Sequence, residues 1–497
     1  MINRLQYRRQ FLLARQGVSE LDSWSVMKVG NYYLQVHPDL EITADSDNKK
    51  SLILLGYLFD PQNYQATNKD ILQNLLASVT NFHELTIALK LYPGRYALFY
   101  QDDKCFYLIQ DALSLREVYY CQKVNTVVCG SQPNLLVRFA QPAILKSTDP
   151  ELLEFVQNHL PYVRDGRLWV GDETCFDNVK HLMPNHYLDL NLMSVKRYWP
   201  ESKLENIDLD KAAKLTANYL KGVLNAVTHR HNVMMAVTSG TDSRSLLAAS
   251  KDINNRIYYF INKHKQLIDE SADISVPKRI FDRLNLPFHI HNVKGPVDEE
   301  FRNIFLNNTF MAKDLMLPVV YNVYYKNHQD KVNLLGVGEI GREFYGKPPR
   351  NLDGYYLARC LKYRNSKYAV EQCDKWLQET LSLTKAYNVD IMQLFLWEYL
   401  LGNWGCVGNS ESDIAIEEFN PYDSHYIYEI ILAAKKGKLD IFHNLFQELW
   451  PELLEFPLNP PETKKEKIKD WLKRMGMFRM IKQIVYQFDR WKYYKNQ

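Results

Sequence analysis

The stretch Met234–Ser250, MMAVTSGTDSRSLLAAS, decides the fold of the second half of the chain. An apolar run ending at Val237 is followed by a short turn of small and polar residues and then by a segment with helical spacing. A strand, a turn and a helix in this order are typical of a parallel sheet, in which the turn lies at the carboxyl end of the strand. The next helix presents backbone N–H groups there, so such turns bind anions.

The residues of this turn are chemically suited to phosphate. Gly240 allows close approach of the backbone to a ligand, Ser239 and Ser243 offer hydroxyl groups, and Arg244 can neutralise phosphate charge. The turn is not a Walker sequence, because no Gly-Lys-Ser/Thr follows. Taken alone, the stretch also fits a purely structural turn in which Asp242 or the threonine before it caps the helix.

The flanking sequence divides the chain into two kinds of pattern. The first 200 or so residues read as short strands such as SLILLGYLF and RYALFY, with two helical segments that carry Asn68 and Asp149 near their starts as expected caps. After about residue 205, the strands VMMAVT, RIYYFIN, PFHIHNV and KVNLLGVG alternate with helices, which predicts a parallel sheet. Helical patterns dominate from about residue 355.

Length and composition exclude several classes of protein. A chain of 497 residues with 46% hydrophobic composition predicts two or more packed domains. The net charge of +3 is small, so we expect no nucleic-acid partner. The seven cysteines form no C-x-x-C pair, and no apolar run reaches the roughly 18 residues of a membrane helix or forms a signal-peptide core. We therefore expect a cytoplasmic protein.

Four segments in order resemble the asparagine synthetase family. Residues Thr238–Ser243 resemble its S-G-G-x-D-S pyrophosphate loop, with Thr238 for the first Ser and Ser239 for the first Gly, and IDESADISVPKRIFDRLNLPFHIH resembles its next signature. NLLGVGEIGREFYG stands where the family has S-G-E-G-x-D-E-x-F-G-G, and EEFNPYDS resembles its E-x-R-x-P-F-x-D segment. Upstream, the segments from LILLGYLFDPQN to FDNVKHLMPNHYLDLN are similar, in order, to the family's glutamine amidotransferase domain.

The resemblance implies a fold and a division into domains. Residues 1–203 would form a layered Ntn-hydrolase-like αββα domain, and residues 204–462 a parallel-sheet, Rossmann-like ATP-pyrophosphatase domain with helical additions. Residues 463–497 lie outside the resemblance and read as a basic amphipathic helical tail. Such a tail either lies on an anionic membrane surface or packs on its own domain.

The family hydrolyses glutamine with a cysteine at position two and an Asn-Gly pair that supplies the oxyanion hole. This sequence has Ile2 at the first position and Leu55-Gly56 at the second. Because isoleucine has no nucleophile and leucine donates no side-chain hydrogen bond, we expect the amidotransferase-like domain to lack glutaminase activity.

The resemblance implies that the second domain uses ATP and Mg²⁺. Family members convert a carboxylate into an acyl-adenylate with release of pyrophosphate, and a nitrogen nucleophile then displaces AMP to give an amide. The residues implied in binding the phosphates are Thr238, Ser239, Gly240, Thr241, Asp242, Ser243 and Arg244. Asp242 is also the implied metal ligand. The implied partners are a small-molecule carboxylate and a nitrogen donor, and we expect a homodimer.

Two segments depart from the family pattern at residues with an implied catalytic role. Aligned through Gly338, the family's acidic metal ligand becomes Arg342, whereas Glu343 stays acidic. A guanidinium binds anions where a carboxylate binds cations, so Arg342 either meets pyrophosphate or a substrate carboxylate, or forms a surface ion pair with Glu339 or Glu343. Either ATP chemistry continues with one metal held by other groups, or it is impaired.

The segment EEFNPYDS places Glu417 at the position of an active-site glutamate of the family. There it would act as a general base or as an orienting group, with a solvated helix-end carboxylate as the structural alternative. The arginine expected two residues later is Phe419. The family's lysine near the end of this domain corresponds to Lys464 or Lys465, which the spacing does not distinguish.

Three functions follow from these observations. The first is an AMP-forming amide ligase that takes its nitrogen from elsewhere, acting on a small carboxylate such as a uronic acid in surface-polysaccharide assembly. The second is an intramolecular amide-forming cyclase, as in the β-lactam synthetase branch of the family, which also lacks the glutaminase cysteine. The third is a non-catalytic protein that binds nucleotide or a partner, to which the changes at Ser239 and Arg342 would point.

Overall fold

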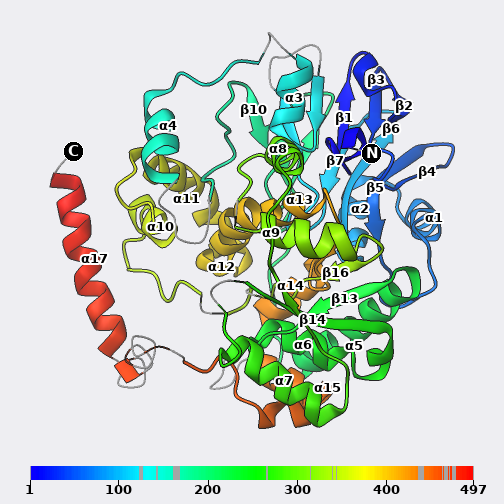
Figure 1. Cartoon of the computed structure of the whole chain (residues 1–497). Coiled ribbons are helices and arrows are strands. Elements are labelled where there is room, and N and C mark those ends of the chain that lie inside the picture. Colours follow the sequence, from blue (N-terminus) through cyan, green and yellow to red (C-terminus); the bar gives the residue numbers. More distant parts are fainter. Residues whose placement is uncertain are drawn as a thin grey trace.

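The structure, a computed structural model, describes most of the chain (Figure 1). The described residues are 2–121, 127–140, 144–160, 168–264, 267–313, 315–338, 340–342, 344–434, 441–461, 463, 468, 471–472 and 477–495. No helix among them is long and apolar enough to span a lipid bilayer.

The N-terminal half contains two antiparallel six-stranded sheets. The first has the strand order β10-β8-β9-β1-β3-β2. Its strands are β1 (Phe11–Ala14), β2 (Ser25–Val29), β3 (Tyr32–Val36), β8 (Tyr119–Cys121), β9 (Val127–Gly130) and β10 (Val179–His181). The second has the order β12-β11-β7-β6-β5-β4. Its strands are β4 (Ile42–Ser46), β5 (Lys50–Leu58), β6 (Gly94–Asp102), β7 (Phe106–Gln110), β11 (His186–Asp189) and β12 (Ser194–Arg197).

These two sheets pack face to face with helices outside them. A buried apolar layer that includes Phe11, Leu34 and Phe99 fills the space between the sheets. Helices α1 (Asn68–Ser78) and α2 (Phe82–Leu89) bury their apolar residues on the outer face of the second sheet, and α3 (Pro133–Ala140) packs on β9 of the first. The predicted layered αββα arrangement is confirmed.

The C-terminal half is built on a five-stranded parallel sheet. Its strand order is β15-β14-β13-β16-β17, with every pair parallel. The strands are β13 (Val233–Ala236), β14 (Ile257–Lys263), β15 (His289–Asn292), β16 (Val332–Leu334) and β17 (Glu417–Phe419). The sequence predicts β13 to β16, because four apolar runs alternate with helices, and the structure confirms these four strands. The fifth strand, β17, is not predicted because its sequence is polar.

Helices surround this sheet and connect the two halves. Helix α4 (Pro150–Glu154) belongs to the N-terminal half. The helices of the C-terminal half are α5 (Leu209–Arg230), α6 (Thr241–Ala249), α7 (Ala272–Leu284), α8 (Glu299–Asn308), α9 (Leu317–Val319), α10 (Gly354–Cys360), α11 (Lys367–Tyr387), α12 (Ile391–Phe395), α13 (Cys406–Ser412), α14 (His425–Ala433), α15 (Ile441–Leu449) and α17 (Met477–Lys495). A π-helical run, Leu396–Gly405, joins α12 to α13.

Of the two expected helix caps, one is confirmed and one is wrong by a residue. Asp149 caps α4 by accepting hydrogen bonds from two backbone N–H groups of the first turn. The cap of α1 is Thr67, which forms a capping box with Asp70. Asn68 is buried instead, and its side chain accepts from the backbone N–H of Leu58 at 3.1 Å.

The two halves share a hydrophobic core. Phe419 of β17 lies 5.0 Å from Phe59 and 5.9 Å from Tyr57, measured between ring centroids, and so packs on the end of β5. The chain passes between the halves after β12, and the next helix, α5, begins at Leu209. The predicted domain boundary at residues 203 and 204 falls in this connection.

Candidate active site

The predicted phosphate loop lies at the carboxyl edge of the parallel sheet. β13 ends at Ala236, and Val237 still donates its backbone N–H to Phe260 of β14 at 2.9 Å. Helix α6 then begins at Thr241, with Gly240 rather than Thr241 or Asp242 at the N-cap position. The turn is built as an anion-binding strand-to-helix turn would be.

The loop is held in shape by its own hydroxyl groups. The Ser243 hydroxyl accepts from the Thr238 backbone N–H at 3.1 Å and lies 3.0 Å from the Thr238 hydroxyl. The Thr238 hydroxyl in turn accepts from the Gly240 backbone N–H at 3.1 Å. Ser239 donates its backbone N–H and its hydroxyl to Asp273 of α7, at 3.0 and 2.7 Å. These bonds within the chain fix the shape of the loop.

Asp242 faces an arginine from the loop after β16. Arg342 Nη1 lies 3.0 and 2.9 Å from the two carboxylate oxygens of Asp242. Gln393 fixes this arginine by donating to its backbone carbonyl at 2.7 Å and accepting from the Gly341 N–H at 2.7 Å. The partner of Arg342 is thus Asp242; the predicted partners Glu339 and Glu343 lie outside the described residues, as does the proposed catalytic role of Glu343.

The donor set at this edge fits Mg²⁺ only after a rearrangement. Asp242 and Asp273 offer the carboxylate oxygens that Mg²⁺ prefers. Both oxygens of Asp242 accept from Arg342, however, and one oxygen of Asp273 accepts from Ser239. A divalent cation at Asp242 therefore requires the guanidinium to move away. The side chain of Arg342 is 31% exposed, so that movement does not require the core to open.

Arg244 does not lie where a direct phosphate contact would place it. Its side chain is fully buried, and its two terminal nitrogens lie 3.5 and 3.4 Å from the Phe456 carbonyl. Burial lowers its pKa to about 10. Asn459, three residues after Phe456, donates its backbone N–H to Ser239 and its side-chain amide to Thr241, both at 3.1 Å. The segment Phe456–Asn459 therefore covers the loop, and nothing in the sequence indicated this.

Glu417 lies at the opposite edge of the sheet from the loop. It is the first residue of β17 and stands in register with Val332 and, through β16, with Val233 at the start of β13. The phosphate loop follows the last residue of β13, so the length of the strand separates the two sites. The structure brings together Asp242, Arg342 and the loop residues, but not Glu417.

Glu417 instead forms part of a buried ion cluster between the two halves. Its carboxylate lies 2.9 Å from Arg95, 3.1 Å from Arg116 and 3.4 Å from Arg9, all from the N-terminal half. Asp413, four residues earlier, makes two bonds with Arg95 at 2.6 and 2.7 Å. Burial alone would raise the pKa of Glu417, but the nearby guanidinium groups outweigh it and lower the pKa to about 2. Such a carboxylate is a poor proton acceptor, and in this structure it joins the two halves of the molecule.

This cluster predicts that acid destabilises the protein in a defined pH range. The pKa of Glu417 is about 2 in the folded chain and about 4.5 when the chain is unfolded, so its ionised form favours folding above pH 4.5. That contribution, about 3 kcal/mol, is lost as the pH falls from 4.5 to 2. Urea denaturation of the Glu417→Gln variant should therefore show a shallower loss of stability over this range than the parent chain. Parallel pH profiles would contradict the assignment.

The position of the family's oxyanion hole is closed. Leu55 lies within β5 and is fully buried between the two sheets. Gly56 has a φ of +99° and donates its backbone N–H to the Glu41 carbonyl at 2.8 Å. A Cβ at this position would stand 2.1 Å from the Arg95 carbonyl oxygen, so only glycine is tolerated. Neither residue is placed to stabilise an oxyanion.

We accordingly expect the purified chain to release no glutamate from glutamine. The reason is the buried apolar residue Leu55 at the oxyanion position. A coupled glutamate assay should give the rate of the buffer blank. Glutamate formation proportional to enzyme concentration would refute this expectation.

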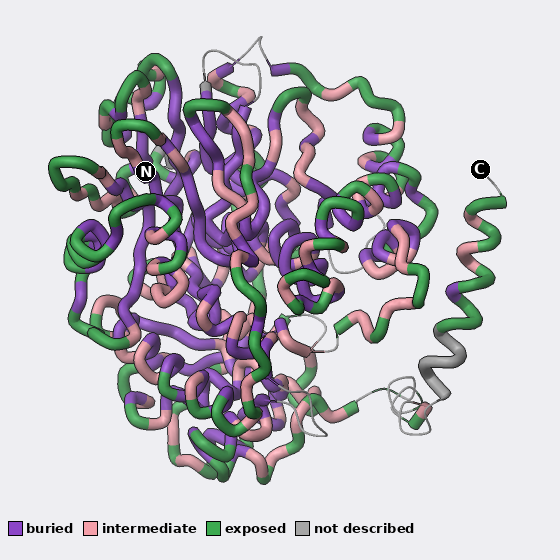
Figure 2. The backbone as a smooth tube through the Cα atoms, turned by 180° about the vertical axis from the view of Figure 1, so that it is seen from behind, coloured by how far each residue is buried: buried purple, intermediate pink, exposed green. Residues whose placement is uncertain are grey.

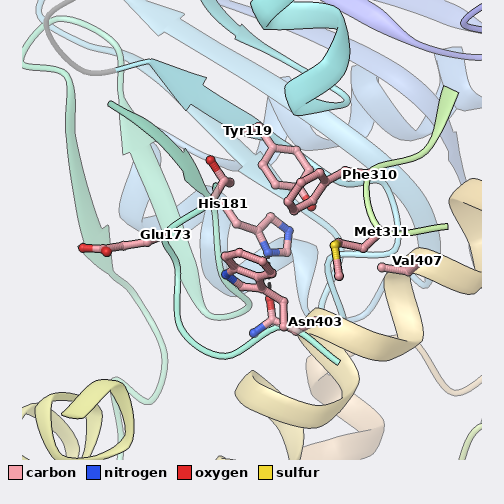
Figure 3. A pocket seen from close by; sticks show the side chains of 9 residues that line it. Tyr119, Glu173, His181, Phe310, Met311, Asn403 and Val407 are labelled. Carbon is pink, nitrogen blue, oxygen red and sulfur yellow. Dashed lines mark hydrogen bonds between the residues drawn. The ribbon is translucent and has the colours of Figure 1, made fainter. Parts of the chain in front are cut away.

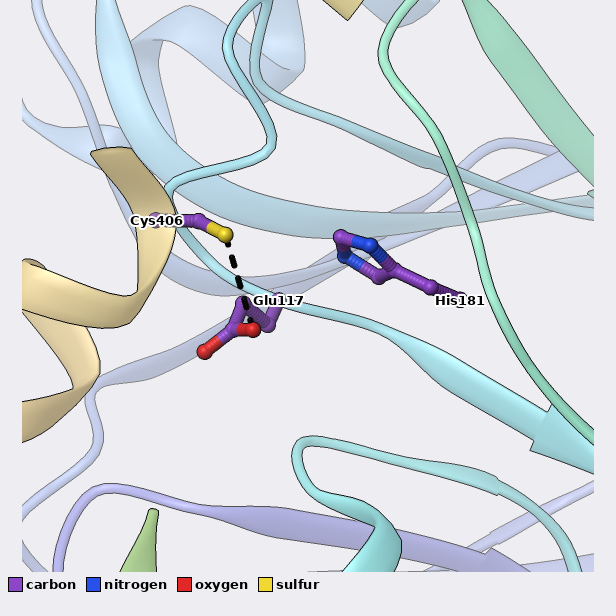
Figure 4. Close-up of side chains that lie close together, drawn as sticks. All are labelled: Glu117, His181 and Cys406. Carbon is purple, nitrogen blue, oxygen red and sulfur yellow. Dashed lines mark hydrogen bonds between the residues drawn. The ribbon is translucent and has the colours of Figure 1, made fainter. Parts of the chain in front are cut away.

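A second polar cluster lies where the two halves meet (Figures 3 and 4). Within the described part of the chain, Glu117, His181 and Cys406 are a group close enough to share a metal ion. Nε2 of His181 has no hydrogen-bond partner among the residues that the structure describes, and the ring borders a cavity of about 10 Å³, room for roughly one water molecule. Burial lowers the pKa of this histidine and raises that of the cysteine thiol.

The hydrogen bonds of this cluster explain it without a metal. Glu117 accepts from Tyr119 at 2.7 Å and from Gln132 at 2.7 Å, and also from Ser410 and from the Cys406 thiol at 3.5 Å. The thiol further donates to the Gly402 carbonyl one helical turn earlier. Because the carboxylate is already surrounded by donors, the cluster is a hydrogen-bonded contact between the two halves.

Comparison with known proteins leaves the family open. No described protein family and no curated protein matches the sequence. Among solved structures, the chain is similar to the glutamine phosphoribosylpyrophosphate amidotransferase from B. subtilis complexed with ADP and GMP, at 10% identity over 67% of this chain and 70% of that chain, with a TM-score of 0.24. A structure of the allosteric regulatory enzyme of purine biosynthesis matches at 11% identity over 74% of each chain, also with a TM-score of 0.24.

A third solved structure is similar over a smaller part of the chain. The NH3-dependent NAD synthetase from Campylobacter jejuni in complex with nitrate is 12% identical over 38% of this chain and 92% of that chain, with a TM-score of 0.21. TM-scores this low do not establish a shared fold. The fold therefore rests on the strand order of this chain, and its function on the geometry of its own loop.

Proposed function

We propose that this chain is an ATP-dependent enzyme that activates a carboxylate by adenylation and converts it into an amide, without a glutaminase activity of its own. The observation that supports this proposal is the preformed loop Thr238–Ser243 at the carboxyl edge of the parallel sheet, with Asp242 and Arg342 converging on it. The strand-to-helix turn suits the phosphates of a nucleotide, and the two charged groups suit Mg²⁺ and phosphate respectively.

The ion pair between Asp242 and Arg342 suggests how the site accepts its ligand. When Mg²⁺ and ATP bind, the carboxylate would turn to the cation and the guanidinium to the phosphate oxygens. The contact between Asp242 and Arg342 would be replaced by two contacts, one between Asp242 and Mg²⁺ and one between Arg342 and phosphate. Before the ligand binds, each side chain therefore neutralises the charge of the other. Arg342 would then stabilise the negative charge that builds up on the departing pyrophosphate.

The reaction needs ATP, a carboxylate and an amine or ammonia, and no other reactant. A substrate carboxylate oxygen attacks the α-phosphorus of ATP, and the bond to the β-phosphate oxygen breaks to release pyrophosphate. An amine or ammonia then attacks the acyl carbon, and the bond to AMP breaks. The nitrogen loses its proton to a base other than Glu417, since that carboxylate lies at the opposite edge of the sheet. We propose a small carboxylate, such as a uronic acid, as the substrate.

A second candidate is a non-catalytic protein that binds nucleotide or a partner at the same loop. It is favoured by the closure of the loop, in which Asp273, Arg342 and Asn459 already occupy the groups that would meet phosphate or metal. A third, intramolecular cyclisation, uses the same activation step and differs only in the source of the nitrogen.

A pyrophosphate-release screen separates these candidates. The full chain is incubated with Mg²⁺, ATP, ammonium and a panel of carboxylates, and products are identified by mass. Release that depends on one carboxylate supports the enzyme, and the product mass distinguishes ammonia addition from ring closure. ATP binding with no pyrophosphate from any carboxylate of the panel would favour the non-catalytic candidate and refute the proposed activity.

A further inference from the structure

Among the described side chains of the C-terminal helix α17, a stripe on one face contacts the helix α10 region. Arg490 Nε lies 2.7 Å from Asp353, which also accepts from the Tyr486 hydroxyl at 3.3 Å. Tyr493 lies 4.8 Å from the ring of Tyr355 in α10, measured between centroids. The three helix residues recur at intervals of four and three, so they form a single stripe directed at α10.

The opposite face of α17 is apolar and exposed. Ile484 and Phe488 are each 63% exposed and Trp491 is 58% exposed, again at intervals of four and three. On a helix of 3.6 residues per turn, these three positions point away from Tyr486 and Tyr493. Figure 2 shows the described part of this helix largely in the colours of exposed and intermediate residues, standing apart from the buried interior. More than half of each of these three side chains is therefore exposed in the described structure.

The sequence of the C-terminal tail is unusually basic. The 35 residues from Thr463 to the C-terminus hold 11 of the 61 Lys and Arg and only three of the 58 Asp and Glu, a net charge of +8. The other 462 residues therefore carry −5 of the total of +3. Within α17 the one acidic residue, Asp489, is neutralised by Arg364 at 2.9 Å. Besides Arg490, which pairs with Asp353, the described basic residues of α17 are Lys492 and Lys495, and the sequence of the whole tail is strongly basic.

We propose that α17 docks the protein on an anionic lipid surface, lying in the plane of the interface with Ile484, Phe488 and Trp491 among the acyl chains. A helix with an apolar face that includes tryptophan and a basic flank is typical of such interfacial binding. Lys495, whose Nζ lies 4.8 Å from the Trp491 ring centroid, is at the depth of the lipid headgroups in this arrangement. The body, with its negative net charge, faces away from the lipid.

The charges disfavour the two other occupants of this face. A second copy of the chain would bring two segments of net charge +8 together, and they would repel. A nucleic acid would satisfy the lysines and arginines but would leave the aliphatic Ile484 in contact with water or phosphate. An anionic bilayer satisfies both the apolar and the basic side chains. This inference is independent of the proposed enzymatic function.

Vesicle flotation tests the proposal on the full chain. The protein is mixed with vesicles of phosphatidylcholine containing about one third phosphatidylglycerol, and in parallel with pure phosphatidylcholine. We expect flotation with the anionic vesicles only, and a fall in the bound fraction when NaCl is raised from about 0.1 to 0.5 M. The F488D/W491D variant should float at least about tenfold less.

Matched controls make each outcome decisive. L192D carries the same kind of charge substitution at a leucine that is 69% exposed in the N-terminal half, and it should float as the parent chain does. K492E/K495E should lose the preference for anionic vesicles. The proposal is overturned if the parent chain stays at the bottom of the gradient, or if F488D/W491D floats equally well. It is also overturned if the parent chain does not float and the F488D/W491D substitutions instead convert a dimer into a monomer or abolish the binding of an oligonucleotide.

Discussion

Replacing Arg95 by methionine is expected to lower the free energy of unfolding by about 3–5 kcal/mol. Arg95 is fully buried and holds Asp413 through two bonds and Glu417 through a third, across the contact between the two halves. Removing the guanidinium leaves carboxylates that are shielded from water and short of one partner, which costs more than the ion pair itself contributes. Urea denaturation followed by circular dichroism measures the change.

Two further variants show whether the effect comes from the buried charges. Arg4→Met removes an arginine that is 71% exposed and pairs with Asp39, so it should change stability by no more than about 1 kcal/mol. The double variant Arg95→Met/Asp413→Leu removes both partners of the bidentate pair and should regain part of the loss. An Arg95→Met protein within 1 kcal/mol of the parent chain would show that this cluster does not hold the two halves together.

The second large effect is expected from Asp242→Asn, which should reduce carboxylate-dependent pyrophosphate release by about 100-fold or more. The amide keeps the shape of the side chain but removes the charge that would bind Mg²⁺ and that now pairs with Arg342. The exposed Asp252, whose side chain is 71% accessible, offers a matched control: Asp252→Asn should leave the rate unchanged.

Arg342→Ala distinguishes the two functions that remain open for the loop. If the guanidinium moves to the phosphates, this variant should also lose activity, by roughly tenfold or more, with a weaker affinity for ATP. If the arginine only closes the site, its removal should strengthen ATP binding, and the proposed exchange of charges would be wrong. The measurement is the rate of pyrophosphate release at several ATP concentrations.

The sequence predicts the elements of the site better than the contacts between them. An apolar run before TSGTDS is enough to predict β13, the turn and α6, because the periodicity of the side chains changes there from strand to helix. The pairing of Asp242 with Arg342 joins residues 100 positions apart, and no local pattern indicates it. The alignment identified Arg342 as unusual, whereas its partner had to come from the structure.

The departures from prediction have physical causes of the same kind. β17 has a polar sequence although it is a buried strand. Glu417 pairs with Arg95 and Arg116, more than 300 residues away, and Glu418 accepts from Asn333. Arginine is a residue that often binds phosphate, but the side chain of Arg244 is buried beneath the segment Phe456–Asn459. In each case a tertiary contact determines the role of a residue whose local sequence suggests another.

Titration calorimetry of the full chain with ATP in the presence of Mg²⁺ tests the central claim most directly. If the loop between β13 and α6 binds nucleotide phosphates, the parent chain should bind one ATP with a dissociation constant between about 1 μM and 1 mM, and Asp242→Asn should weaken that binding by tenfold or more. An absence of binding heat at several temperatures, or equal binding by the two proteins, would contradict the account.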